Sequence, residues 1–365
     1  MSEIKVNSIK GVAASTAALT INNTDGTCTA NLTNRTNKNL IINGAMNVAQ
    51  RGTSSTSTGF YTVDRFANSW GGQDEALTQA QVNVSSGTTP YTLGFRKALK
   101  FTNGNQTSTD AGDIVYIEHQ IEGQDIANSG WNYTSSSSFI TLSFWVKSSV
   151  SQDFKAYIRA RDGTSQIYPF STGTLSADTW TKVTKTIPGN SNLTFDNDTG
   201  GSFQLFIWPY IGTTYTDAGV TENAWTAYAS ASRTPVSATT WWTTNDATFE
   251  ITGVQLEVGS VATDFEHRSF AQELALCQRY YFNFFASKHN SNGDYEIEFV
   301  PANMRAVPTV TRLGNVMFGG ESSTSVSSIQ TLTTGQNADI MCLRLVLINS
   351  SDANCGGKYA LSAEL

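Results

Sequence analysis

The most constraining feature of the sequence is the alternation of apolar and polar side chains in short segments that turn-forming residues separate. In residues 139–147, for example, Ile140, Leu142, Phe144 and Val146 occupy every second position. Successive side chains of a β-strand point to opposite faces of its sheet, so these four residues share one face. The segment therefore predicts a strand, and we expect the neighbouring Trp145 to pack in a core.

Similar segments recur from Asn39 to about Asp264, between clusters of Gly, Asn, Asp and Ser. They span Leu40–Asn43, Tyr61–Trp70, Tyr91–Phe101, Ile114–Ile121, Phe139–Lys147, Lys155–Ala160, Trp180–Ile187, Phe203–Tyr210 and Thr248–Glu257. Only 15% of the residues are charged, which disfavours a helical exterior. Short strands without alternating helices are typical of an all-β sandwich or jelly roll. We therefore predict a jelly-roll domain over residues 39–267.

One segment, residues 269–285, has a helical pattern. Ser269 is followed three positions later by Gln272, which is the arrangement of a capping box. The residues expected on the buried face of this helix are Phe270, Leu274, Cys277 and Tyr281. Glu273 is expected on a more exposed position. We predict that residues 268–290 form a helical connector between two β units.

The β pattern resumes after Gly293, where Tyr295, Ile297 and Phe299 alternate with glutamates. Further strand-like segments follow up to the end of the sequence. They predict a small C-terminal β-sandwich domain over residues 291–365.

The first 38 residues contain no aromatic side chain. Leu19 and Ile21 on one side of a turn, and Cys28 and Ala30 on the other, predict a hairpin. So few large apolar residues cannot bury enough surface for independent folding. We expect residues 1–38 to become ordered only by docking on something larger or by pairing with copies of themselves, with a flexible tail as the alternative.

Composition and charge disfavour several classes of function. Acidic residues outnumber basic ones by 30 to 23, which argues against nucleic-acid binding. The apolar runs are far shorter than the roughly 20 residues of a membrane helix, and the start of the chain lacks the apolar core of a secretory signal. The cysteines, Cys28, Cys277, Cys342 and Cys355, form no CxxC pair. We expect no metal, no cofactor and mostly buried thiols, with a Cys342–Cys355 pairing left open.

Signs of catalysis are also lacking in the sequence. It contains no GxSxG, HExxH or P-loop string, and its loop carboxylates show no spacing that implies an acid–base pair. We therefore expect a protein that is not an enzyme, with a polysaccharide depolymerase as a disfavoured alternative. Asp196, Asn197 and Asp198 could offer oxygen ligands to calcium, although an Asx-rich turn is favoured.

Five aromatic residues are the candidate glycan-binding residues: Trp208, Tyr210, Trp225, Trp241 and Trp242. Residues 210–244 are rich in Thr, Ala and Ser and are expected to form long loops on one end or face of the sandwich. An aromatic ring in a loop can stack on the apolar face of a sugar, while amides and hydroxyls bond its hydroxyl groups. The alternative is packing in the core or against loops, with one of the adjacent tryptophans in each place.

Residues 39–52 (NLIINGAMNVAQRG) and 61–65 (YTVDR) together resemble the opening of a jelly-roll domain of phage tail fibres and other virion proteins. Residues 249–260 (FEITGVQLEVGS), 262–265 (ATDF) and 276–281 (LCQRYY) resemble its last strand and the helix that follows.

The distal domain of such fibres is similar to residues 299–310 (FVPANMRAVPTV) and 359–365 (YALSAEL). The opening MSEIKVN resembles the particle-attachment ends of marine podovirus fibres. The jelly roll is also similar to carbohydrate-binding modules that hold calcium. Because the calcium-ligand positions fall on Thr252 and Gly253 here, the metal is not carried over.

The resemblance implies a virion appendage, assembled in the host cytoplasm, that is usually a homotrimer. Its implied partners are copies of itself, other virion proteins through residues 1–38, and host surface polysaccharide. The expected function is that of a tail fibre that binds host glycans. A head fibre, a capsid decoration protein or a tail adaptor built from the same modules is the alternative.

Overall fold

The computed structural model describes residues 37–289 without interruption, and residues 304–306, 308–315 and 354–365. It also describes shorter segments at positions 6, 8–9, 19–21, 28–30, 295–299, 328–332 and 342–347.

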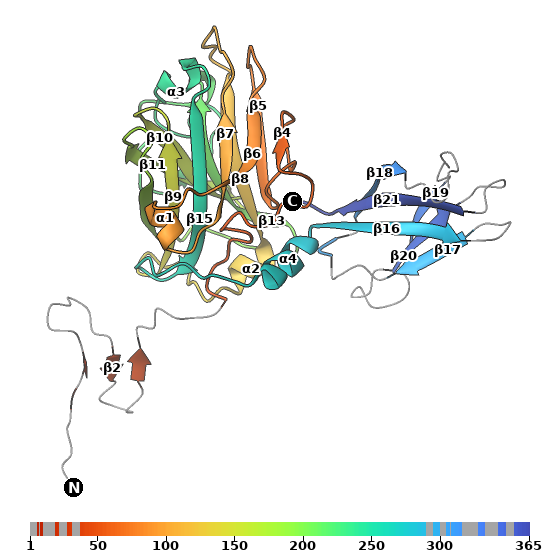
Figure 1. Ribbon diagram of the computed structural model, residues 1–365. Coiled ribbons are helices and arrows are strands. Elements are labelled where there is room, and N and C mark those ends of the chain that lie inside the picture. The colour runs from red at the N-terminus through yellow and green to blue at the C-terminus, as the bar shows by residue number, and fades with distance from the viewer. Residues whose placement is uncertain are drawn as a thin grey trace.

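The largest unit is a sandwich of two antiparallel six-stranded sheets (Figure 1). The first sheet has the order β14 (Thr226–Ala227), β11 (Gln166–Thr174), β10 (Asp153–Ala160), β13 (Gly201–Ile211), β8 (Ile114–Glu122) and β5 (Phe66–Gly71). The second has the order β12 (Thr181–Pro188), β9 (Phe139–Ser148), β15 (Thr248–Val258), β7 (Lys97–Thr102), β6 (Thr78–Asn83) and β4 (Ser54–Ser55). The predicted all-β jelly-roll sandwich is confirmed.

The core between the two sheets follows the alternation in the sequence. Ile140, Leu142, Phe144 and Val146 of β9 are all fully buried in it. Trp145 points to the opposite face of the same sheet and is only half-buried, so the expectation that it lies in the core is wrong. The reason is the pleat itself, which turns each successive side chain to the other face.

The sequence pattern misplaced several elements. The segment expected as a strand over Tyr91–Phe101 begins instead with helix α1 (Thr89–Thr92), because Pro90 occupies its first turn, and the strand starts at Lys97. Strand β5 starts at Phe66 rather than Tyr61. Leu40–Asn43 forms no strand, although Ile41 and Asn43 are buried. Strands β6 and β11 escaped prediction because their sequences, TQAQVN and QIYPFSTGT, lack a clear apolar alternation.

Helix α4 (Phe270–Gln278) connects the sandwich to the C-terminal sheets. It begins with the predicted capping box, in which Ser269 and Gln272 exchange both hydrogen bonds. It ends earlier than expected, because Tyr281–His289 forms strand β16. Consecutive aromatic residues favour the extended conformation, which overrides the helical spacing.

The buried face of α4 also differs from the prediction. Cys277 and Tyr281 are buried as predicted, but Phe270 is 60% exposed and Glu273 is buried. Glu273 accepts a hydrogen bond of 2.5 Å from the backbone N–H of Asn43 and lies 3.5 Å from the Arg268 guanidinium. These partners compensate the burial of the carboxylate, which hydrophobic spacing alone could not reveal.

The remaining helices are short: α2 (Gly123–Ala127), α3 (Thr240–Thr243) and the 3₁₀ turn η1 (Thr213–Tyr215). No helix of the described residues has the length and apolarity that a membrane crossing requires.

The C-terminal region contains two three-stranded sheets, as predicted for a small β-sandwich. One has the order β16, β21 (Asn354–Ser362) and β18 (Thr309–Asn315), and the other β17 (Tyr295–Phe299), β20 (Cys342–Leu347) and β19 (Ser328–Leu332). Cys342 of β20 and Cys355 of β21 therefore belong to strands of different sheets and not to the two arms of one hairpin. Figure 1 shows α4 and β16 leading from the base of the jelly roll into these sheets.

The N-terminal segment contributes a third small sheet, formed by β1 (Ser8–Ile9), β2 (Leu19–Ile21) and β3 (Cys28–Ala30). Leu19 pairs with Ala30 and Ile21 with Cys28 in antiparallel register, so the predicted hairpin is confirmed. The expected turn between them lies outside the described residues. The attachment role of residues 1–38 stays a prediction.

Candidate functional site

The structure separates the five aromatic residues proposed from the sequence. Trp208, Trp241 and Trp242 are completely buried, and Tyr210 is 3% exposed. These four side chains are core residues and present no ring face to a sugar. Only Trp225 is half-buried at the surface.

Both adjacent tryptophans enter the core, not one of them as expected. The Trp242 ring stacks on Tyr210 with centroids 5.0 Å apart, and its Nε1 donates to the Ser108 carbonyl at 2.9 Å. The backbone N–H of Trp241 donates to the Gln152 side chain at 2.8 Å. The two rings fill the end of the sandwich at helix α3.

Trp208 lies on the outer face of the first sheet, in strand β13, where residues 213–234 cover it. Its ring packs on Tyr116 with centroids 4.7 Å apart, and the Arg233 guanidinium lies 5.9 Å from it. Strand β13 is therefore buried on both faces. The expectation of loops over residues 210–244 holds for most of this segment, but the loops cover the aromatic residue instead of presenting it.

Trp225 borders a surface hollow of about 480 Å³, here called the Trp225 hollow. Its lining residues are Thr164, Gln166, Ser191, Asn192, Thr194, Trp225, Thr226 and Ala227. They come from three places: the end of the β10–β11 loop with the start of β11, the loop between β12 and β13, and strand β14. All eight are uncharged.

The Trp225 indole is held in a defined orientation. Its Nε1 donates to the Pro188 carbonyl at 2.7 Å, and its ring meets Tyr168 edge-on with centroids 5.4 Å apart. Burial raises the pKa of the Tyr168 hydroxyl. A fixed ring among hydroxyl and amide groups can stack on a sugar and bond its hydroxyls. The sequence did not reveal the polar partners, because they are distant from Trp225 along the chain.

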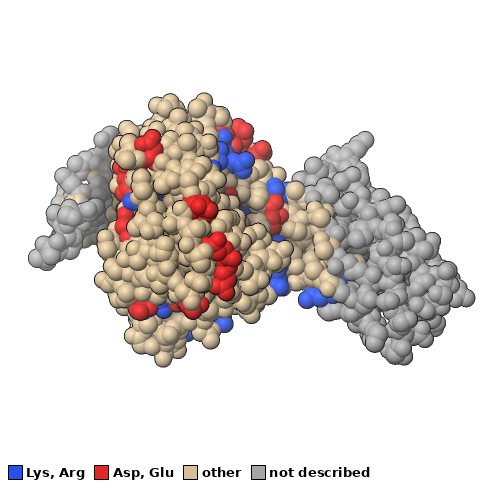
Figure 2. All heavy atoms as spheres, turned by 90° about the horizontal axis from the view of Figure 1, so that it is seen from above, with Lys and Arg blue, Asp and Glu red and all other residues tan. Residues whose placement is uncertain are grey.

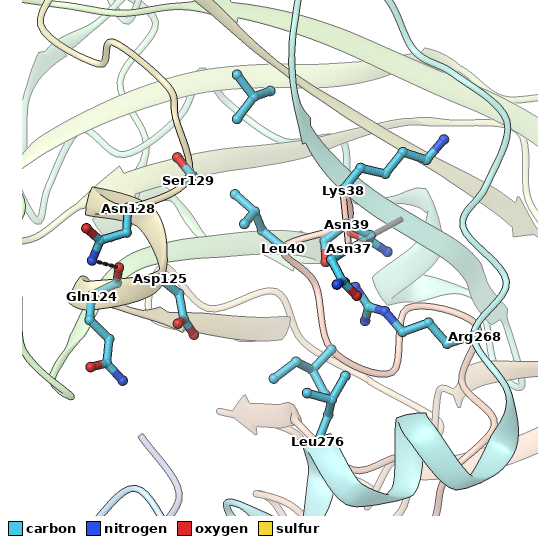
Figure 3. Close-up of a pocket in the computed structure, with 12 residues that line it drawn as sticks. Asn37, Lys38, Asn39, Leu40, Gln124, Asp125, Asn128, Ser129, Arg268 and Leu276 are labelled. Carbon is cyan, nitrogen blue, oxygen red and sulfur yellow. Dashed lines mark hydrogen bonds between the residues drawn. The ribbon is translucent and has the colours of Figure 1, made fainter. Parts of the chain in front are cut away.

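A larger hollow of about 660 Å³, the junction hollow, lies where residues 37–42 approach α2 and α4 (Figure 3). Figure 3 shows Lys38 and Arg268 on one side of the junction hollow, Asp125 on the other and Leu276 below. Burial raises the pKa of Asp125, and the Glu122 charge adds to the effect. Arg268 donates to the Asn39 carbonyl, so this cation already has a structural partner. Among the described residues that line the junction hollow, none is aromatic.

The described residues contain no cluster of three or more His, Cys, Asp or Glu side chains that could hold a metal ion. Asp198 Oδ1 accepts the backbone N–H of Gly200 at 2.8 Å, which is the Asx turn favoured for this segment. Thr252 Oγ1 donates to the Lys97 carbonyl at 2.7 Å.

No protein-family model and no curated protein matches this chain. Among solved structures, it is similar to the enzymatically active domain of tailspike protein 4 from bacteriophage CBA120, with 12% identity and a TM-score of 0.31. That alignment covers 60% of this chain and 21% of the tailspike chain, so this chain spans about a fifth of the tailspike's length.

Two further solved structures are similar to this chain at comparably low sequence identity. The N-terminal cellulose-binding domain of Cellulomonas fimi β-1,4-glucanase C aligns at 12% identity and a TM-score of 0.30, over 59% of this chain and 100% of the domain. The tripod of the bacteriophage Tuc2009 baseplate aligns at 12% identity and a TM-score of 0.28, over 65% of this chain and 60% of the other. At these values the similarities carry no conclusion about function.

Proposed function

We propose that this chain is a non-catalytic phage tail-fibre protein that attaches the virion to host surface glycans. The observation that carries the glycan-binding part is the Trp225 hollow, which combines one oriented indole with uncharged hydroxyl and amide groups. This is the chemistry that neutral sugars require, since their rings have apolar faces and hydroxyl edges. The virion part rests on the resemblance of residues 39–65 and 249–281 to fibre proteins.

The surface of the jelly roll supports the same function. Figure 2 shows a face on which uncharged residues predominate and charged residues are scattered. A surface on which uncharged residues predominate suits adhesion to hydrated neutral polysaccharide, and the net charge of −7 gives no attraction to phosphate polymers.

The proposal of a non-catalytic protein rests on the composition of the hollow. Glycoside hydrolysis commonly uses two carboxyl groups about 5–9.5 Å apart on either side of the bond that is cleaved. The described residues that line the Trp225 hollow include no Asp or Glu. Incubation of the protein with host polysaccharide should release no reducing ends; their release would contradict this part of the proposal.

Glycan binding is tested on an array of neutral oligosaccharides with the full-length chain, Trp225→Ala and Trp180→Ala. Trp180 is another half-buried tryptophan that lines neither hollow described above, so its variant is the matched control. We expect Trp225→Ala to lose the signals of the parent chain and Trp180→Ala to keep them. Equal signals from all three proteins would contradict the assignment of the hollow.

The assembly is tested separately. Light scattering should give three times the chain mass of 39.5 kDa, because the small end segments need partners for stability. A gold label on the N-terminus should appear on phage tails in electron micrographs. Label on the capsid would instead support the alternative of a head fibre or decoration protein.

A further inference from the structure

The second sheet of the sandwich carries another ring-bearing hollow, of about 280 Å³, here called the Trp145 hollow. Its lining residues are Leu93, Phe95, Ser143, Trp145, Lys182, Gly253, Thr263, Asp264, Phe265 and His267. Trp145 and Ser143 project from the outer face of β9, whose other face forms the core. The Trp145 hollow is therefore on a different sheet from strand β14 of the Trp225 hollow.

A local break in strand β15 shapes the floor of this hollow. The register between β15 and β9 shifts between Thr252 and Gln255, and Gly253 adopts a φ of +64°. A Cβ atom at Gly253 would lie 2.6 Å from the Phe95 ring, so only glycine lets this ring lie against the sheet. Phe95 in turn contacts Phe265, with centroids 4.9 Å apart.

One wall of the hollow is fixed by a hydrogen bond. His267 Nε2 donates to the Leu93 carbonyl at 2.8 Å, and its ring lies 5.2 Å from that of Phe95. The segment that follows β15 is thus held over the sheet face and encloses the half-buried Trp145.

Two side chains of opposite charge, Lys182 and Asp264, lie at the edge of the Trp145 hollow. Lys182 of β12 is directly opposite Trp145 in the register of the two strands, so the two side chains share a face. Lys182 and Asp264 are both exposed. The ammonium can donate to a sugar hydroxyl and the carboxylate can accept from one, and their charges balance.

We propose that the Trp145 hollow is a second saccharide-binding subsite, which takes one neutral pyranose ring stacked on Trp145 and hydrogen-bonded to Lys182 and Asp264. The volume of about 280 Å³ lies just below the range of about 300–1,000 Å³ for ligand pockets, which suits a single sugar ring. The jelly roll is then bivalent, and each chain gains avidity on a repetitive polysaccharide. This inference extends the proposed function but uses none of the residues of the Trp225 hollow.

The test counts bound sugars by native mass spectrometry of the full-length protein with cellotriose, maltotriose and mannotriose, which are too short to bridge distant sites. We expect two trisaccharides per chain for the parent and for Trp180→Ala. Trp145→Ala and Trp225→Ala should each bind one, and the double variant none. Titration calorimetry should show the weaker binding at the altered site as a loss of about tenfold or more in affinity.

Lys182→Ala is a second variant of the same hollow, in case Trp145→Ala fails to fold. The Lys182 side chain is exposed, so this substitution should leave folding intact and weaken sugar binding at the Trp145 hollow about tenfold. If the parent binds one trisaccharide, which Trp225→Ala loses and Trp145→Ala keeps, the second subsite is wrong while the proposed function stands. If the parent binds none of the three trisaccharides, the proposal of a second subsite is wrong as well. If the parent also gives no signal on the oligosaccharide array, the proposed glycan-binding function is wrong too.

Discussion

The Arg65 guanidinium carbon lies 3.4 Å from the centroid of the Tyr280 ring, at the point where helix α4 leaves the jelly roll. Arg65 is only 1% exposed, and it also donates to the Glu364 carboxylate at 2.5 Å and to the Gln120 carbonyl at 2.7 Å. A buried cation of the sandwich is thus covered by an aromatic ring of the connector and paired with a carboxylate that follows β21. These contacts join the jelly roll to the C-terminal sheets.

The stacking predicts that Tyr280→Ala is far more damaging than Tyr280→Phe. Alanine removes the ring, leaves a cavity and uncovers the Arg65 charge, with an expected loss of about 3 kcal/mol in the free energy of unfolding. Phenylalanine keeps the ring and loses only the hydrogen bond of 2.6 Å from the Tyr280 hydroxyl to the Glu122 carboxylate, at about 1.5 kcal/mol. Guanidinium denaturation monitored by circular dichroism measures both. Equal losses would show that the stacking contributes nothing.

The junction should also make stability depend on acid through Glu122. Burial acts to raise the pKa of this carboxyl, but hydrogen bonds from Arg279 and Tyr280 outweigh it, so its pKa lies below the ordinary value. A lowered folded-state pKa stabilises the protein above the unfolded-state value of about 4.3, and this stabilisation is lost as the pH falls through the folded-state pKa. Glu122→Gln should therefore be destabilised relative to the parent at pH 7, with a difference that shrinks toward pH 3.

Asp64 acts in the opposite direction, so the comparison needs a control. Burial raises the pKa of Asp64, with hydrogen bonds from Gln50 opposing it, and protonation of this group favours the folded state as the pH falls. Asp64→Asn in the same denaturation series should remove that compensation and steepen the loss in acid. A Glu122→Gln difference that is constant from pH 7 to pH 3 would contradict the role given to Glu122.

The sequence predicted secondary structure correctly where the signal lies in a few neighbouring residues. The alternation over Ile140–Val146 located β9, and the Ser269–Gln272 pair located the start of α4, because both signals are local. The end of α4 was misplaced because helical spacing continues by chance through Tyr281, where pairing with Ser362 of β21 decides the conformation.

The candidate site was less accessible from the sequence because it depends on contacts between distant segments. The Asn103 side chain donates to the carbonyls of Trp241 and Trp242 at 3.2 and 2.7 Å, and this contact across the fold secures the helical turn that buries both rings. Most of the polar residues around Trp225 likewise come from distant parts of the chain, at positions 164–166 and 191–194. The aromatic residues of the sequence indicated sugar-binding chemistry, but only the tertiary structure shows which of their rings are buried and which are accessible.

Gly253 offers a test of how the Trp145 hollow is built. Gly253→Ala strains a backbone with φ +64° and places a Cβ atom 2.6 Å from the Phe95 ring, with an expected cost of about 3 kcal/mol. Gly87→Ala is the control, since Gly87 has φ +82° but no atom within 4 Å of its added Cβ, and it should cost about 1 kcal/mol. Urea unfolding midpoints give the comparison, and equal costs would mean that Phe95 moves away freely.

The different positions of Trp242 and Trp225 predict different effects of their substitution on stability and on glycan binding. Trp242→Ala leaves a cavity at a fully buried position, removes the stacking on Tyr210 and takes away the hydrogen-bond donor of the Ser108 carbonyl. It should therefore lower the free energy of unfolding by about 3–5 kcal/mol. Trp225→Ala removes a half-buried ring and one hydrogen bond, so about 1–2 kcal/mol is expected. Thermal melting of both variants beside the parent measures the difference. No sugar can reach the buried Trp242 ring, so Trp242→Ala should lose glycan binding only in proportion to the fraction of protein that is unfolded. Trp225→Ala should lose glycan binding while the protein is still folded. A Trp242→Ala protein that melts like the parent would contradict the position of this ring in the core.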